Sequence, residues 1–263
     1  MRWSPGGGSR NVEDRRGSGG MGMAPMGIGG AIVLLVLSLV FGRDFVSNAP
    51  VDSGTQKRDS AAGEVGQVQQ TPEEAKEVQF VEWVLDTTQA TWSRVMPEQL
   101  GARWHDAKLV LFRGATRTAC GVGQTAMGPF YCPLDEKVYV DLSFYDELKQ
   151  RFGAPGDFAQ AYVLAHELGH HVQHLLGTDA KVRRFQQANP DEANHASVLL
   201  ELQADCYAGV WGHYAEAGGA LDPGDVEEGL NAAAAVGDDR MQRQAGRQVN
   251  MDSFTHGSSA QRE

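Results

Sequence analysis

Two histidines four residues apart, inside a helical pattern, constrain this chain more than any other feature. His166 and His170 stand in the run Ala165-His166-Glu167-Leu168-Gly169-His170. Apolar residues recur at helical spacing from Asp157 to a glycine stop at Gly177, which predicts one amphipathic helix. Residues four apart share a helix face, so both imidazoles can reach a common point. The fold must keep that point accessible.

The run has the form HExxH, which is typical of zinc sites on helices. A tetrahedral zinc ion takes histidine nitrogens at about 2.0–2.1 Å, a reach that the spacing of His166 and His170 permits. Glu167 follows the first histidine directly and can take a proton from a metal-activated water. We therefore expect one Zn²⁺ per chain, bound by the two histidines, with Glu167 as the catalytic general base.

A catalytic zinc site needs a third protein ligand and an open position. A third histidine six residues after His170 would complete one known pattern, but Leu176 stands there. The alternative is a carboxylate from a following helix, where Glu201 precedes Asp205 by one turn on the same face. We expect Glu201 to bind zinc and Asp205 to accept a hydrogen bond from His166.

Further polar side chains lie near the motif or far along the chain. His171 and His174 are interpreted as surface residues or as supports around the site. A developing oxyanion needs a donor beside the metal. His256, or a tyrosine such as Tyr207, is the candidate, and His256 is predicted as a second catalytic residue.

The charge balance and the cysteines limit the class of protein. The 263 residues contain 34 acidic and 23 basic side chains, for a net charge of −11, and no basic cluster suggests a phosphate-tracking surface. Nucleic acid is therefore excluded as an expected partner. Cys120 and Cys132 fall in one glycine-rich loop and are either a disulfide or two free thiols. Cys206 is interpreted as a small buried apolar residue.

The N-terminal quarter divides by composition. Residues 1–23 are rich in Gly and Arg and predict a disordered cytoplasmic tail. Residues 24–42 carry no charge and are about long enough for one transmembrane helix. Residues 43–70 form a polar linker, and residues 71–263 are predicted to be the zinc metallopeptidase domain.

The flanking charges indicate the orientation of this segment. Four arginines precede it and three basic residues follow, which favours a cytoplasmic N-terminus and a catalytic domain outside the cytoplasm. The expected localisation is thus a single-pass membrane protein. A cleaved signal peptide is the alternative, because Ser47-Asn48-Ala49 resembles a cleavage site.

The domain itself reads as α+β, mostly helical with a small sheet. Thr71-Pro72 predicts a helix start, with the helix running to about Arg94. Strands are predicted at Lys108–Phe112 and Lys137–Leu142, and the second is hypothesised to be the sheet edge that binds an extended substrate. Later helices are predicted to start near Ser143, Asn189 and Asp222.

The chain resembles a bacterial family of neutral zinc metallopeptidases, within the gluzincin group. The matching segments are Met1-Arg2-Trp3, Asn11 to Arg16, Gly128 to Pro133, Lys137 to Leu142, His166 to Gln173, Glu201 to Trp211 and Asp252 to Gly257. The resemblance implies a zincin-like fold, one N-terminal membrane anchor and hydrolysis of a peptide or protein substrate. Members usually continue beyond the run at Ser258 to Arg262, whereas this sequence stops at Glu263.

The predicted function is zinc-dependent hydrolysis of peptide bonds. One alternative is a membrane-tethered, zinc-stabilised binding protein without turnover. Glu167 separates the two, because a structural zinc site has no use for a carboxylate beside its first histidine and normally closes the fourth position. A zinc hydrolase acting on a non-peptide amide is a third interpretation.

Overall fold

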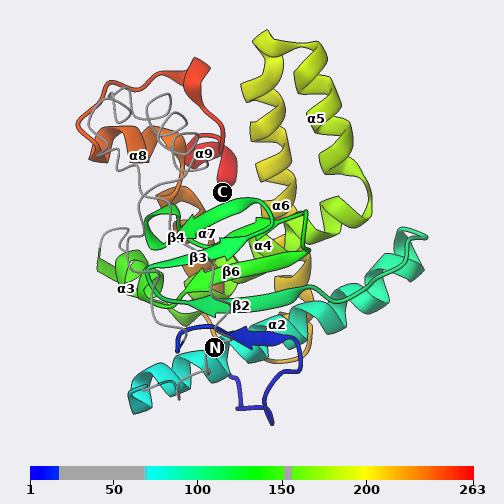
Figure 1. The fold of residues 1–263 in the computed structure, drawn as a ribbon, viewed down its shortest axis with the longest axis vertical. Helices are drawn as coiled ribbons and strands as arrows, with labels where there is room; N and C mark the ends of the chain where they lie inside the picture. Colours follow the sequence, from blue (N-terminus) through cyan, green and yellow to red (C-terminus); the bar gives the residue numbers. More distant parts are fainter. Residues whose placement is uncertain (18–67, 69, 151–155) are drawn as a thin grey trace, which may run out of the picture.

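A small mixed sheet and a larger group of helices make up the fold, which confirms the expected mostly helical α+β class (Figure 1). The computed structural model describes residues 1–17, 68, 70–150 and 156–263. The apolar segment 24–42 and most of the linker lie outside these residues. Within the described ranges, no helix is both long enough and apolar enough to cross a membrane.

The main sheet has four strands in the order β1 (Val12–Asp14), β2 (Lys108–Phe112), β6 (Lys137–Asp141) and β5 (Phe130–Cys132). The first three are parallel and β5 runs antiparallel to β6. The interior strands β2 and β6 are buried almost throughout, as expected for strands covered on both faces. The hypothesis that Lys137–Leu142 forms the sheet edge is wrong, because β6 lies between β2 and β5.

The glycine-rich loop contains more structure than its sequence indicates. A hairpin of β3 (Ala115–Thr118) and β4 (Gly121–Gln124) occupies it. Cys120 and Cys132 form a disulfide that ties the end of this hairpin to β5, which decides between the two readings of the pair. Cys206 is exposed, so its interpretation as a buried apolar residue was wrong.

Helices make up most of the described chain, and two long ones, α4 (Asp157–Leu175) and α6 (Ala193–Ala217), carry the predicted ligands. The other described helices are α2 (Pro72–Gln99), α3 (Ser143–Gln150), α5 (Thr178–Ala188), α7 (Asp225–Ala235), α8 (Asp238–Gln244) and α9 (Ser259–Arg262). Short 3-10 turns lie at Thr125–Met127, Pro190–Glu192 and Met251–Ser253. Helix α4 contacts α2, α5, α6 and α7, so the histidine helix is the centre of the helical part.

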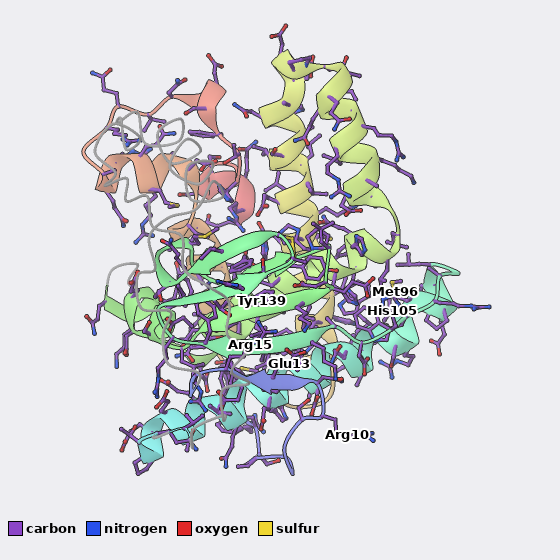
Figure 2. The ribbon with its side chains drawn as sticks, in the orientation of Figure 1. Arg10, Glu13, Arg15, Met96, His105 and Tyr139 are labelled. Carbon is purple, nitrogen blue, oxygen red and sulfur yellow. A yellow bond between two sulfur atoms is a disulfide. The ribbon has the colours of Figure 1, made fainter. Side chains whose placement is uncertain are left out.

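Residues 1–17 pack against the domain, so their expected disorder was wrong. Strand β1 pairs with β2 in parallel, with Val12 opposite Leu109. Glu13 accepts a hydrogen bond from Lys137 of β6 at 2.7 Å. The guanidinium of Arg15 lies 5.9 Å from the ring centre of Tyr139, and both side chains are labelled in Figure 2. The glycine and arginine content suggested a solvated tail, but the charged residues find partners on the sheet.

Arg16 is the most buried residue of the segment 1–17. Its side chain is only 2% exposed and forms ion pairs with Asp14 at 2.6 Å and with Glu74 of α2 at 3.0 Å. It also donates to Gln70 at 2.9 Å. A buried guanidinium is stable only with such partners, so the tail and α2 depend on each other.

Replacing Arg16 with alanine should therefore destabilise the whole domain. We expect a loss of about 2–3 kcal/mol in the free energy of unfolding, less than for a fully buried pair because Asp14 is one-third exposed. Urea unfolding followed by tryptophan fluorescence measures it. Arg10→Ala is the matched control: Arg10 is exposed, and its change should stay within about 0.5 kcal/mol. Equal midpoints for both variants would contradict the role of the tail.

Candidate metal centre

The close approach of α6 to α4 brings the predicted ligands together. Gly169, inside the HExxH motif, permits this approach because it has no side chain. A Cβ atom at Gly169 would lie 2.9 Å from the backbone oxygen of Ala204 and 3.2 Å from its Cα. Any larger residue would push the helices apart. Glu201, one turn before Ala204, is thereby carried over the face of α4 that bears the histidines.

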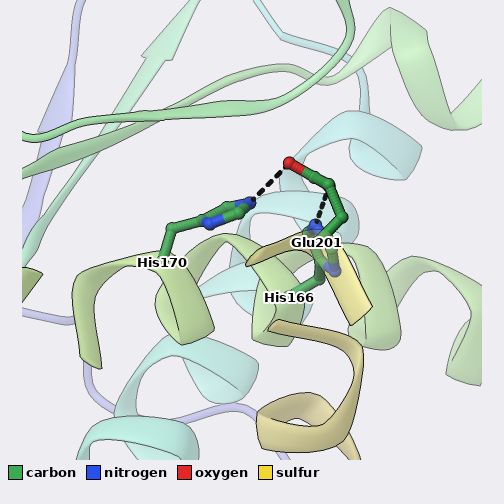
Figure 3. Close-up of side chains that lie close together, drawn as sticks. All are labelled: His166, His170 and Glu201. Atoms are coloured by element: carbon green, nitrogen blue, oxygen red, sulfur yellow. Dashed lines mark hydrogen bonds and ion pairs between the residues drawn. The ribbon is translucent and has the colours of Figure 1, made fainter. Parts of the chain in front are cut away.

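Three predicted ligands converge at this crossing (Figure 3). The Nε2 atom of His166 lies 3.2 Å from one carboxylate oxygen of Glu201, and Nε2 of His170 lies 3.5 Å from the other. One ligand atom from each residue falls within 4.8 Å of the other two. Zinc bonds of about 2.0–2.1 Å in a tetrahedron place neighbouring ligand atoms about 3.4 Å apart. The donor set therefore fits zinc in both chemistry and spacing.

Asp205 lies where the sequence predicted it, against the other nitrogen of His166. The distance between Nδ1 of His166 and Oδ1 of Asp205 is 2.7 Å. Arg262 of α9 donates to both oxygens of Asp205 at 2.8 and 2.9 Å, and the hydroxyl of Tyr162 also donates to it. A carboxylate held in this way fixes the tautomer of the histidine and leaves Nε2 free for a metal.

The charges of these groups are strongly coupled. Burial alone would lower the pKa of His166, but hydrogen bonds to Asp205 and Glu201 raise it to about 10. Burial would raise the pKa of Glu201, yet the hydrogen bond with His166 and the charge of His170 lower it to about 2. Without a metal the site is thus an ion pair, and zinc would replace the proton of His166.

Glu167 lies beside the ligands and belongs to the same cavity. A hollow of about 750 Å³ is bordered by His166, Glu167, His170 and Glu201. Glu167 is 8% exposed, and its carboxyl group accepts a hydrogen bond from the backbone of Tyr131 in β5. Burial raises the pKa of Glu167 to about 7, near the operating pH of a general base.

His256 borders the same cavity, whereas Tyr207 does not. His256 comes from the turn before α9, and its Nδ1 atom lies 3.3 Å from Asp238. The hydrogen bond with Asp238 raises the pKa of His256 above its ordinary value, although burial opposes the shift. Tyr207 packs edge-on against Trp92, with ring centres 5.2 Å apart, away from the cavity. The structure therefore leaves His256 as the candidate donor.

The extra histidines of α4 have different surroundings. His171 is completely buried, and its Nε2 donates to the backbone oxygen of His105 at 2.8 Å. Its Nδ1 then accepts from the hydroxyl of Tyr131 at 2.9 Å. Burial lowers the pKa of His171 to about 4, so its ring is neutral. Its hydrogen bond with Tyr131 holds β5 against α4. His174 is partly exposed and pairs with Asp179 at 2.9 Å.

Sequence reasoning missed four residues that support the site. Gln173 contacts His170, Arg262 and Tyr162 contact Asp205, and Asp238 contacts His256. Gln173 stands three residues after His170 on one helix face, so helical spacing was the available signal. Arg262 and Asp238 had no local signal, because each is distant in sequence from the metal ligands.

Comparison with known proteins agrees with this geometry. All of residues 1–263 match the family described as "Putative neutral zinc metallopeptidase". The uncharacterized protein YpfJ of Escherichia coli is 50% identical over 275 residues, covering 100% of this chain and 92% of its own. An uncharacterized protein of Mycobacterium tuberculosis is 42% identical over 189 residues, 68% of this chain and 61% of its own. No solved structure matches the chain. The chain belongs to the neutral zinc metallopeptidase family.

Proposed function

We propose that this protein is a zinc-dependent peptidase that cleaves peptides or proteins. The observation that carries the proposal is the convergence of His166, His170 and Glu201 beside the buried carboxyl of Glu167 in one cavity. A purely structural zinc site would gain nothing from an additional carboxyl group that binds no metal and has a pKa near 7. This weighs against a binding protein without turnover.

The roles of the residues follow from their positions. When bound, a zinc ion supplies Lewis-acid chemistry, lowering the pKa of a water molecule and polarising a carbonyl oxygen. Glu167 accepts the proton of the attacking water and later transfers it to the amine that leaves. His256, held by Asp238, donates a hydrogen bond to the oxyanion that develops on the substrate.

Strand β5 is the better candidate for binding an extended substrate, in place of β6. It is the outer strand of the four-stranded sheet, so among the described residues one side of its backbone has no strand partner. Its residue Tyr131 also touches Glu167 through the backbone. A peptide that added to β5 as a further strand would therefore pass the general base.

Replacing Glu167 with glutamine tests the catalytic assignment. The amide is nearly isosteric and ligates nothing, so zinc content should stay near one per chain while cleavage of a mixed peptide library falls below about 1% of wild type. Metal analysis and mass spectrometry of the digest measure the two quantities. Undiminished cleavage by the variant would remove Glu167 as the base, and no cleavage by a zinc-loaded wild type would favour the binding protein.

Replacing His256 with alanine should slow catalysis without releasing the metal. Loss of one oxyanion donor costs about 10²–10³ in kcat. Because His256 is not among the convergent ligand atoms, zinc affinity should change little. Tyr207→Phe is the control, since Tyr207 is not among the residues that line the cavity. If the phenylalanine variant lost activity and the alanine variant did not, the assignment would be reversed.

We also infer that residues 1–17 and the peptidase domain occupy one compartment. Strand β1 is paired with β2, and Arg16 is buried against α2. A single membrane span at residues 24–42 would put the tail and the domain on opposite sides. That orientation and this pairing cannot both hold within one molecule.

Cysteine labelling in intact cells tests the shared compartment. Arg10→Cys and Lys181→Cys place single exposed thiols on the tail and on α5 when Cys206 is changed to serine. A membrane-impermeant maleimide should label both sites or neither before lysis, and both after it. Labelling of only the Lys181→Cys site in intact cells would restore the expected cytoplasmic tail and external domain.

A further inference from the structure

Gln173 is a buried side chain that has no role in the proposed hydrolysis. It is fully buried on α4, one turn beyond His170. Its Oε1 atom lies 2.8 Å from Nδ1 of His170. We propose that Gln173 is a positioning residue that fixes the second zinc histidine and couples it to the helix bearing the third ligand.

The orientation of the amide is determined by its other partners. The Nε2 atom of Gln173 lies 2.7 Å from the backbone oxygen of Leu200, which can only accept a hydrogen bond. The same nitrogen lies 3.0 Å from Oε1 of Gln203. The NH₂ group of Gln173 must therefore point to α6, and its oxygen must point to His170. His170 is forced to donate from Nδ1, which leaves Nε2 unprotonated, with its lone pair available to a metal ion shared with Glu201.

The amide also connects the two helices at the ligands themselves. Leu200, whose backbone oxygen accepts this hydrogen bond, is the residue immediately before Glu201. One side chain thus holds His170 and the backbone at Glu201 in a fixed relation. This arrangement preorganises two ligands from different helices, whereas Asp205 holds only one ligand, His166.

An amide rather than a carboxylate suits this position. Glu167, Glu201 and Asp205 already bring three carboxyl groups into the site, and all three are largely buried. A neutral acceptor orients His170 without adding a fourth buried negative charge, which would have to be desolvated. The two histidines are therefore held by chemically different partners, Asp205 on one and Gln173 on the other.

Zinc affinity of the full chain tests the inference, and this readout does not require peptidase activity. Gln173→Leu removes the acceptor and the donor while keeping the volume, and should weaken zinc binding about 10- to 100-fold in competition with a chromophoric chelator. Gln173→Glu keeps an oxygen for Nδ1 of His170 but loses the donor to Leu200 and adds a buried charge, so it should bind zinc more weakly than wild type and more tightly than Gln173→Leu. Glutamate also serves as the second variant if leucine prevents folding.

Gln186→Leu is the matched control for a lost bond between helices. Gln186 joins α5 to α6 through Ala193 and Ser197 at 3.0 and 2.8 Å, and touches no ligand. The zinc affinity of the Gln186→Leu variant should remain within about twofold of wild type. Equal affinities for wild type and Gln173→Leu, or equal losses for Gln173→Leu and Gln186→Leu, would overturn the inference.

The inference rests on the proposed zinc site, and its failure is distinguishable from failure of the proposed function. A wild-type chain that binds no zinc would overturn both. A wild-type chain that binds zinc but cleaves nothing would remove the peptidase and leave the affinity comparison intact. Unaltered zinc binding by Gln173→Leu would remove only the positioning role.

Discussion

The crossing of α4 and α6 at Gly169 is the constraint on which the rest of the site depends. Without a side chain at this position the two helix backbones come into contact at Ala204. That contact sets Glu201 within 3.2 and 3.5 Å of the two histidines. A metal centre built from two helices needs such a fixed crossing, because a displacement of 1 Å would exceed the tolerance of a zinc bond.

A second requirement is the compensation of buried charge. Glu201 and Asp205 face His166 from its two sides, and Arg262 neutralises Asp205 from a different helix. Arg262 is 3% exposed, so its guanidinium and the carboxylate stabilise each other only while α9 stays docked. The C-terminal part of the chain therefore belongs to the metal centre, both through this ion pair and through His256 at the cavity. Strand β5, held to α4 by the hydrogen bond between Tyr131 and His171, also lines the cavity.

Local patterns predicted the helices and the convergence of His166, His170 and Glu201 correctly, and failed where partners were distant. The start of α2 followed from Thr71, whose side chain caps Glu74 as its type suggests. The helix of the motif, Glu201 and Asp205 followed from spacing alone. Strand β1 was missed because three residues in a Gly- and Arg-rich tail show no periodicity. The β3–β4 hairpin was missed because its glycines resemble a loop, and its register depends on contacts across the turn.

By itself the sequence predicted a zinc site, since two histidines four residues apart with a glutamate after the first allow few other uses. It also predicted Glu201 as the third ligand, from its position one turn before Asp205 on a following helix. Tertiary structure decided what surrounds these ligands: the amide of Gln173 on His170, Arg262 on Asp205, and Asp238 on His256. It also decided that residues 1–17 belong to the folded domain. The physical reason is that helical spacing acts over a few residues, whereas buried charges and sheet edges are satisfied by whichever groups the fold brings near.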